Sequence, residues 1–458
     1  MKYSLLPLFA LWIGCSEQQP VPQPTPSQPM ADLSQPDPTP SATSPEALFN
    51  QGRSLQARAD FSGAEGRYRQ AIASAPDNAQ YPYYLGTVLH ATSRYGEARA
   101  AFEKSIQLKN DYAAPRIALG KLLYDVDGNA DKARLLLEEA LSLAPHATEA
   151  QYTLGIIQLR EGLSEEAVNL FSQLVKSDSS NAQARTQLGL AYLQQNDLVR
   201  AQEELQRAAS TAPYYSPAYH GLGQTFIRQG KVDVGQRLLQ RAQQLEEEAT
   251  QLTPHQNALR QNPNQPPAHY NLASMYARFG RLREAAQHFS QAITLDSTYA
   301  LAYQGLGNLY QRLGSTPESR ATYAGRARAL YQRALQLNPQ LAETHNNLGL
   351  LLHSTGDVAT AVEHYEKAAE LEPQAGFYQA NLSRGHFELK QYDSARQAAE
   401  RAIQADPSLN GAHETLGDIY AAQGDWTNAL SAWENIGSQN TTEALDQKIA
   451  QARSHLSQ

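Results

Sequence analysis

Apolar and polar side chains alternate with a helical period along most of this chain, and residues 346–373 show the pattern most clearly. Small and apolar side chains recur there three or four residues apart, the spacing of one helix face. Pro373 ends the stretch, because its ring clashes with a continuing helical turn. Gly356-Asp357 divides it with residues typical of a turn. The pattern predicts two helices joined as a hairpin, with inward positions at Leu348, Gly349, Ala361, Tyr365 and Ala368.

The same hairpin pattern recurs along the chain. With Gly349 as the reference, the equivalent positions are 52, 86, 120, 155, 189, 223, 273, 307, 349, 383 and 417. Seven of the ten intervals between them are 34 residues long. A single hairpin cannot bury its apolar face alone, so we expect the hairpins to stack into a continuous core.

This period, with Leu-Gly, Ala, an aromatic residue and Pro at fixed places, resembles the tetratricopeptide repeat family. The resemblance implies an all-α fold: a right-handed superhelical solenoid of about eleven helical hairpins whose first helices line a concave groove. We expect six repeats in residues 45–248, five in 266–441 and a capping helix in 442–458. The apolar stripe of that last helix is Leu445, Ile449, Ala452 and Leu456.

Two intervals are longer than 34 residues. The interval of 50 contains residues 249–265, a polar stretch with prolines that we interpret as an exposed connecting segment between two blocks of repeats. The interval of 42 contains Thr316-Pro317-Glu318, which is typical of a helix start. Eight extra residues are about 2.2 helical turns, so we expect an elongated second helix there.

The first 44 residues lack the repeat pattern. Residues 1–14 combine Lys2 with a short apolar run, which predicts a secretory signal peptide. Residues 15–44 are rich in Pro, Gln, Ser and Thr and have too little apolar surface to fold. They predict a disordered tether in front of the repeats.

Cys15 is the only cysteine in the chain and follows Gly14. This placement resembles the lipobox of bacterial lipoproteins, although Trp12 stands where that class usually has leucine. The resemblance implies a lipid on Cys15, and Ser16 after it implies the outer membrane, facing the periplasm. An ordinary signal peptide or an uncleaved anchor is the alternative.

Composition and motifs argue against several other classes of protein. A net charge of −8 leaves no basic surface for nucleic acid. The segment Asp125–Asp131 begins like a calcium loop, but Ala130 and Leu136 stand where that loop needs Gly and Glu, so we interpret it as an interhelical turn. No zinc-protease motif or nucleophile elbow is present in the sequence. We therefore expect no catalytic residue, metal or cofactor.

Histidines near the starts of first helices are expected to face the groove or solvent. These are His220, His269, His345 and His413. The glycines of "GLGQTF" and "GLGNLY" fall inside predicted first helices without a preceding strand, so we interpret them as packing glycines rather than nucleotide loops.

Asparagines recur on the groove side of the first helices. If Gly349 is the eighth place of its repeat, Asn271, Asn347 and Asn381 share the sixth place and Asn308 holds the ninth. The series resembles the asparagine ladder of O-linked N-acetylglucosamine transferases, whose carboxamides bind an extended peptide backbone. The alternative is that these amides only cap or solvate the helices. Asn346, at the fifth place, is predicted to be a surface residue.

Tyr83, Tyr152 and Tyr270 share the fifth place and form a second candidate surface, for a peptide or a sugar. Together these features predict a non-enzymatic scaffold at the bacterial cell envelope that binds extended segments of envelope proteins. Its layout is similar to pilus-assembly lipoproteins and to scaffolds of polysaccharide export. The alternative is a non-catalytic subunit of a polysaccharide synthesis or export machine whose groove contacts glycan.

Overall fold

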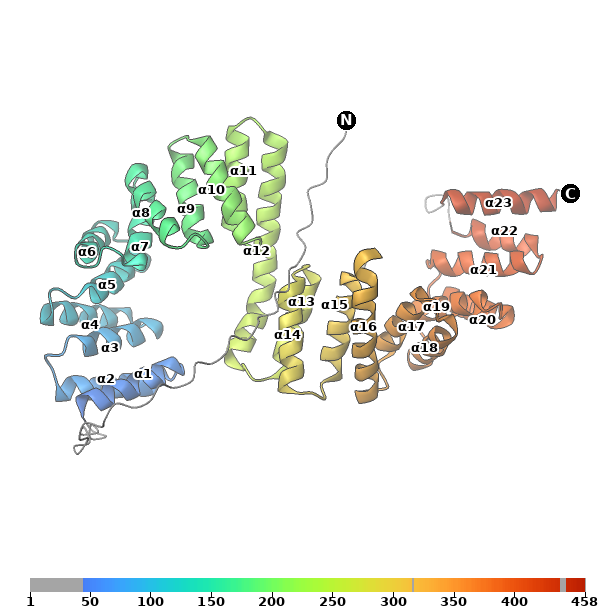
Figure 1. Cartoon of the computed structure of the whole chain (residues 1–458), viewed down its shortest axis with the longest axis horizontal. Coiled ribbons are helices and arrows are strands. Elements are labelled where there is room, and N and C mark those ends of the chain that lie inside the picture. The colour runs from blue at the N-terminus through green and yellow to red at the C-terminus, as the bar shows by residue number, and fades with distance from the viewer. Residues whose placement is uncertain (1–43, 315–316, 437–441, 458) are drawn as a thin grey trace, which may run out of the picture. The chain divides into compact units, whose positions relative to one another are not determined.

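The structure, a computed structural model, describes residues 44–314, 317–436 and 442–457. In these ranges it contains 23 α-helices and no strand, which confirms the predicted all-α class (Figure 1). The predicted signal peptide, Cys15 and the tether before Ser44 lie outside the described residues. Ser44 itself caps the first helix, since its side chain accepts a hydrogen bond from the backbone N–H of Ala47 at 3.1 Å.

The chain divides into two compact units, residues 1–204 and 205–458. In the first unit, from α1 to α8, each odd-numbered helix pairs with the next even-numbered one as a hairpin. Its helices are α1 (Pro45–Ala57), α2 (Phe61–Ser74), α3 (Gln80–Ala91), α4 (Tyr95–Leu108), α5 (Ala113–Asp125), α6 (Ala130–Leu143), α7 (Thr148–Arg160), α8 (Ser164–Ser177) and α9 (Ala182–Gln194). The helix α10 (Leu198–Thr211) contains the boundary between the units.

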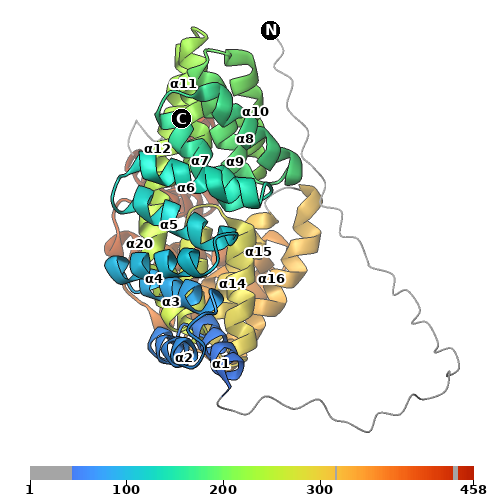
Figure 2. The same cartoon turned by 90° about the vertical axis from the view of Figure 1, so that its left-hand side faces the viewer.

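The second unit repeats the same pairing. Its helices are α11 (Ser216–Arg228), α12 (Val232–Gln261), α13 (Pro266–Arg278), α14 (Leu282–Leu295), α15 (Ala300–Leu313), α16 (Pro317–Leu337), α17 (Ala342–Ser354), α18 (Val358–Leu371), α19 (Gly376–Glu388), α20 (Tyr392–Ala405), α21 (Asn410–Ala422), α22 (Trp426–Glu434) and α23 (Glu443–Leu456). Figure 2 shows α14, α15 and α16 side by side, as their contacts also indicate.

The expected inward residues form the contact between the two helices of a hairpin. A Cβ atom placed on Gly349 would lie 2.6 Å from Cε1 of Tyr365, a distance that real Cβ atoms do not reach. Tyr365 is fully buried, as is Ala361 beside it. Glycine is therefore needed at Gly349 to let the tyrosine ring approach the first helix. Gly356 turns the chain between these helices with a φ of +90°, a conformation that favours glycine.

Most of the expected connection in residues 249–265 is helical, because α12 continues as one helix of 30 residues through Pro254 to Gln261. Leu245, Leu252 and Leu259 follow one another at intervals of seven residues, so they share one face of this helix. Leu252 is buried in a cluster with Leu272 of α13, and Leu259 packs against the same cluster. This packing holds the helix together across the proline. The insertion before residue 337 likewise lengthens a second helix, α16, to 21 residues, as expected.

The C-terminal helix α23 covers the last hairpin. Leu445 and Ala452 are buried against α22, and Ile449 packs partly on the same cluster. Leu456, expected in the same stripe, is instead 48% exposed. Lys448 adds hydrogen bonds of 2.8 Å to the carboxylates of Glu414 and Asp418 on α21.

First helices of successive hairpins touch one another in both units: α3, α5, α7 and α9 in one, and α13, α15, α17, α19 and α21 in the other. Side chains at the same place of neighbouring repeats are therefore close enough to interact. This arrangement positions the candidate site.

Candidate functional site

Four asparagines form a continuous chain of side-chain hydrogen bonds across α15, α17 and α19. Asn347 Nδ2 donates to Asn308 Oδ1 at 2.9 Å, Asn346 Nδ2 donates to Asn347 Oδ1 at 3.4 Å, and Asn381 Nδ2 donates to Asn346 Oδ1 at 2.7 Å. We call this set the amide chain. It joins three successive repeats through groups that both donate and accept.

One end of the amide chain is Asn308, which is partly buried. Its Oδ1 accepts from Asn347 and also from the hydroxyl of Tyr331, a fully buried side chain of α16, at 2.9 Å. Its Nδ2 donates to Glu343 at 3.1 Å. The same Tyr331 hydroxyl lies 2.7 Å from Gln311 Oε1, so its single proton is shared between these two acceptors. These contacts tie Asn308 to α16 and α17.

The other end, Asn381, is open. It uses one N–H toward Asn346, and its Oδ1 accepts no hydrogen bond from the described residues. One donor and a whole carbonyl oxygen are left for a further partner, which is the set that one peptide unit requires. Asn381 is thus an end of the amide chain with unused hydrogen-bonding groups.

The sequence prediction identified three members of the amide chain and misjudged one residue, Asn346. Asn346, predicted to be a surface residue, is only 4% exposed and connects Asn347 to Asn381. Asn271 is exposed on α13 and does not join the amide chain. Burial of Asn346 follows from the contact between α17 and α19, which the repeat pattern alone does not reveal.

Asn381 and Arg384 line two cavities on the first-helix side of α19. One, of about 220 Å³, adds Leu350, His353 and Tyr365 among its walls. The second, of about 400 Å³, extends toward α21 and is lined by Phe387, Glu388, Gly411, Glu414, Thr415 and Asp418. Both cavities open next to the free amide of Asn381.

Charges of both signs surround these cavities. Glu388 accepts from His353 Nε2 at 2.9 Å and pairs with Arg384 at 3.5 Å. Burial raises the pKa of the Asp418 carboxyl above its usual range, and the hydrogen bond from Lys448 opposes this shift. Because acidic and basic side chains both surround these cavities, they suit a polar peptide segment with little net charge better than a strongly charged one.

The three candidate tyrosines pack inside their hairpins. The rings of Tyr83, Tyr152 and Tyr270 contact a phenylalanine of the second helix with centroids 6.1, 5.9 and 5.7 Å apart, respectively. Burial raises the pKa of Tyr83 and of Tyr152, so both remain neutral phenols. Tyr83 alone among them lines a described cavity, of about 220 Å³, next to Lys121. Among the described residues, the rings of Tyr83 and Tyr152 make no contact with each other, and Tyr270 belongs to the other unit.

Three of the four histidines near the starts of first helices do not face the groove. Only His220 is exposed. His269 and His413 are 8% exposed, and each directs Nε2 to a proline carbonyl oxygen in the turn before its helix, at 3.0 and 3.1 Å. His345 does the same with Pro339 at 3.2 Å. The place they occupy, four residues before the reference position, points into the hairpin.

Two of these histidines form pairs with a second histidine nineteen residues later. His269 and His288 have their Nδ1 atoms 3.0 Å apart, and His345 and His364 have theirs 2.9 Å apart. Since Nε2 of His345 donates to a carbonyl, its Nδ1 accepts from Nδ1–H of His364. Burial lowers the pKa of His288, of His345 and of His364.

Other candidate chemistry is structural in the described ranges. Asp125 ends α5, and Asn129 caps α6 by accepting from the N–H of Lys132 at 3.1 Å, so this segment is the predicted interhelical turn. Within 44–314, 317–436 and 442–457, no three His, Cys, Asp or Glu side chains gather as a metal site. Over the same ranges, none of the helices has the length and apolar character needed to cross a bilayer.

Several known proteins are similar to this chain. The Protein CTR9 homolog of Arabidopsis thaliana is 25% identical over 402 residues, which cover 86% of this chain and 32% of that protein. Cellulose synthase operon protein C of Xanthomonas axonopodis pv. citri (strain 306) is 26% identical over 293 residues, covering 62% of this chain and 18% of that protein. The chain thus spans a minor part of the length of either relative.

Two solved structures are similar to this chain as well. YrrB, described as a TPR protein with an unusual peptide-binding site, has 19% identity and a TM-score of 0.36, over 44% of this chain and 98% of that one. A chain of the APC/C hetero-tetramer Cut9-Hcn1 has 14% identity and a TM-score of 0.36, over 89% of this chain and 96% of that one.

Family profiles match most of the chain. Those described as tetratricopeptide repeat match residues 49–113, 117–168, 152–216, 297–374 and 381–437. One described as TPR repeat matches residues 274–314. These matches agree with the period of 34 residues and with the stacked hairpins. The chain belongs to the tetratricopeptide repeat family.

Proposed function

We propose that this protein is a non-enzymatic scaffold of the bacterial cell envelope that binds an extended segment of a partner protein along α17, α19 and α21. A lipid on Cys15 holds it at the membrane, in the outer membrane on the periplasmic side. Proteins of this family typically act as non-catalytic scaffolds that bind other proteins, which supports the general part of the proposal. The binding residues and the envelope location are the specific part.

The observation that carries the proposal is the open amide of Asn381 at the end of the amide chain. An extended peptide presents one N–H and one C=O per residue, and a carboxamide can pair with both without reading the side chain. The hydrogen bond that Asn381 Nδ2 donates to Asn346 Oδ1 fixes the orientation of this amide before a partner arrives. Preorganisation of this kind lowers the entropy lost on binding.

A photo-crosslinking experiment in the full-length chain tests the site. A crosslinking amino acid replaces Arg384, whose side chain is 69% exposed beside Asn381. The matched control position is Asn169, an exposed residue on the second helix α8. We expect partner peptides to crosslink at Arg384 and not at Asn169. We expect Asn381→Ala in the same chain to reduce that yield, whereas unchanged recovery of every crosslinked peptide would disprove the role of the amide.

The lipid anchor has a separate test. Changing Cys15 to Ala removes the only thiol that a lipid could modify, and one or more acyl chains contribute about 0.8 kcal/mol per buried methylene. The Cys15→Ala protein is expected in the soluble fraction after cell disruption. Retention of this variant in the membrane fraction would show that the anchor is not a lipid on Cys15.

A second candidate is a non-catalytic subunit of a polysaccharide machine, whose groove contacts glycan. It is favoured by the similarity to cellulose synthase operon protein C. Sugar sites usually offer an aromatic ring face, and among the candidate tyrosines only Tyr83 lines a described cavity. The crosslinking experiment separates the two candidates, because glycan rather than peptide would then be attached at the probe.

A further inference from the structure

One place is closed by two internal hydrogen bonds in five of the repeats. The side chain four residues before the reference position reaches back to the turn before its helix and across to its own second helix. Gln151 donates to the carbonyl of Pro145 at 2.8 Å and to Gln173 at 3.1 Å. Arg116, Arg185, His269 and His345 make the corresponding two kinds of bond.

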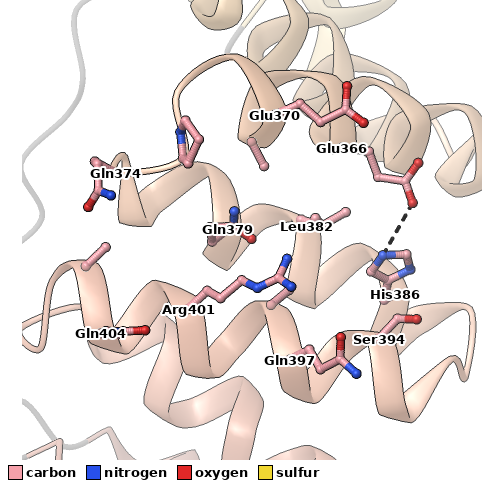
Figure 3. A pocket seen from close by; sticks show the side chains of 14 residues that line it. Glu366, Glu370, Gln374, Gln379, Leu382, His386, Ser394, Gln397, Arg401 and Gln404 are labelled. Carbon is pink, nitrogen blue, oxygen red and sulfur yellow. Dashed lines mark ion pairs between the residues drawn. The ribbon is translucent and has the colours of Figure 1, made fainter.

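In α19 this place is open. Gln379 is 5% exposed, yet its Oε1 is buried without a hydrogen-bond partner among the described residues. The residue nineteen positions later, a histidine in the two histidine pairs, is here Ala398. Alanine is too small and apolar to reach the amide. A cavity of about 890 Å³ results between α18, α19 and α20, and Figure 3 shows Gln379 directed into it. We call it the α18–α20 cavity.

The α18–α20 cavity contains a free positive charge. Figure 3 shows Arg401 of α20 reaching into it, and this guanidinium makes no ion pair with any residue in the described ranges. The acidic residues on the facing wall are already engaged. Glu370 accepts from Lys367 at 2.9 Å, and Glu366 lies 3.6 Å from Nε2 of His386. An unpaired fork of N–H donors is therefore the strongest recognition element present.

The α18–α20 cavity is distinct from the surface around Asn381. Gln379, Leu382 and His386 are spaced three and four residues apart and share one face of α19. Asn381 and Arg384 occupy the other face, where they line the cavities described above. A ligand in the α18–α20 cavity would leave the amide chain untouched.

The two unsatisfied groups define the chemistry of the ligand. The buried oxygen of Gln379 requires an N–H donor, and a guanidinium pairs best with a carboxylate or a phosphate. The two glutamates on the facing wall disfavour a doubly charged phosphate. No Phe, Tyr or Trp ring lines the α18–α20 cavity to stack on a sugar. Its volume lies in the range of ligand sites.

We propose that the α18–α20 cavity is a second binding site, for a short peptide segment that carries a carboxylate. A backbone N–H of the segment donates to Gln379 Oε1, and the carboxylate pairs with Arg401. Leu382 and the alanines of α18 and α20 provide an apolar floor under the peptide backbone. The site does not depend on the proposed peptide binding at Asn381.

Saturation-transfer NMR with the full-length chain tests this site. The probes are the acetylated and amidated peptide Ala-Ala-Glu-Ala-Ala, its glutamine counterpart, its phosphoserine counterpart, and acetylated pentaalanine with a free C-terminal carboxylate. We expect a saturation-transfer signal from the glutamate peptide and no such signal from its glutamine counterpart. The free-acid peptide shows whether a chain terminus also supplies the carboxylate. Stronger binding of the phosphoserine peptide would overturn the preference for a carboxylate.

Two variants and one control locate the binding. Arg401→Gln should weaken the glutamate peptide by about tenfold or more, since it removes a charge-assisted pair. Arg396→Gln, on the same helix but outside the cavity, should have no effect. The double change Gln379→His and Ala398→His should rebuild the histidine pair of α17 and α18, close the cavity and abolish binding. The proposal would be refuted if Arg401→Gln and the double variant both bound the glutamate peptide as tightly as the wild type does. It would also be refuted if no probe bound to the wild type.

Discussion

The two histidine pairs should make the second unit sensitive to acid. In the pair of His345 and His364, one Nδ1–H points at the other Nδ1 over 2.9 Å, while Nε2 of His345 is held by Pro339. Protonating both rings would bring two N–H groups face to face. Burial lowers the pKa of His345 and, together with the positive charge on its neighbour, that of His364.

The size of the effect follows from proton linkage. In the unfolded chain a histidine titrates near its usual pKa of about 6.5. Because the folded pKa is lower, the unfolded chain binds more protons as the pH falls below about 6.5, and the free energy of unfolding decreases. The stabilisation is complete above that pH. At pH 5.5 each such histidine lowers the free energy of unfolding by up to about 1.4 kcal/mol. His288, His345 and His364 together lower it by at most about 4 kcal/mol.

Hydrogen exchange with mass spectrometry, corrected for intrinsic rates, measures this loss helix by helix. Between pH 7.5 and 5.5 we expect protection of α17 and α18 to fall more than that of α5 and α6, where Arg116 holds the place of the histidine. His345→Gln is the matched variant, because Gln151 makes the same bond to its turn carbonyl. It should reduce the acid effect. An equal loss of protection in wild type and variant would refute the reasoning.

Two further predictions concern stability. Gly349→Ala should lower the Tm, because overpacking against the buried Tyr365 costs about 1–3 kcal/mol and the gain in helix propensity returns only about 1 kcal/mol. Gly66→Ala, in α2 with no atom within 4 Å of the new Cβ, should raise the Tm. A lower Tm in both variants would point to a cause other than the contact between residue 349 and Tyr365. Tyr331→Phe removes the hydroxyl that is shared between Asn308 and Gln311 and should cost about 1–2 kcal/mol in urea unfolding, whereas an unchanged midpoint would show that this hydroxyl adds nothing.

The fold was predictable because its determinants are local. The contact of Gly349 with Tyr365 is set by helical spacing within one hairpin, and the same spacing recurs in every repeat. The long helix α12 was missed because Pro254 was interpreted as a break. The leucines on either side of that proline keep one face of a helix, at Leu245, Leu252 and Leu259, and this spacing was the available signal.

The candidate site was only partly predictable. Asn308, Asn347 and Asn381 were found from their places in the repeats, but the bonds between them depend on packing between hairpins. Asn346 shows this limit, since no other repeat has an asparagine at its place and only the neighbouring α19 explains its burial. The pair of His345 and His364 had a visible signal, because the same separation of nineteen residues recurs in His269 and His288.

The length of α12 has a mechanical consequence. A helix of 30 residues is roughly 45 Å long, and its two halves belong to different neighbours: it pairs with α11 near its start and packs through Leu252 on α13 near its end. Other hairpins meet at a short turn, where a pulling force can peel one from the next. The hairpins that share α12 can separate only if α12 itself unfolds. Stretched from its ends, the second unit should therefore yield in steps, with the hairpins on either side of α12 giving way as one.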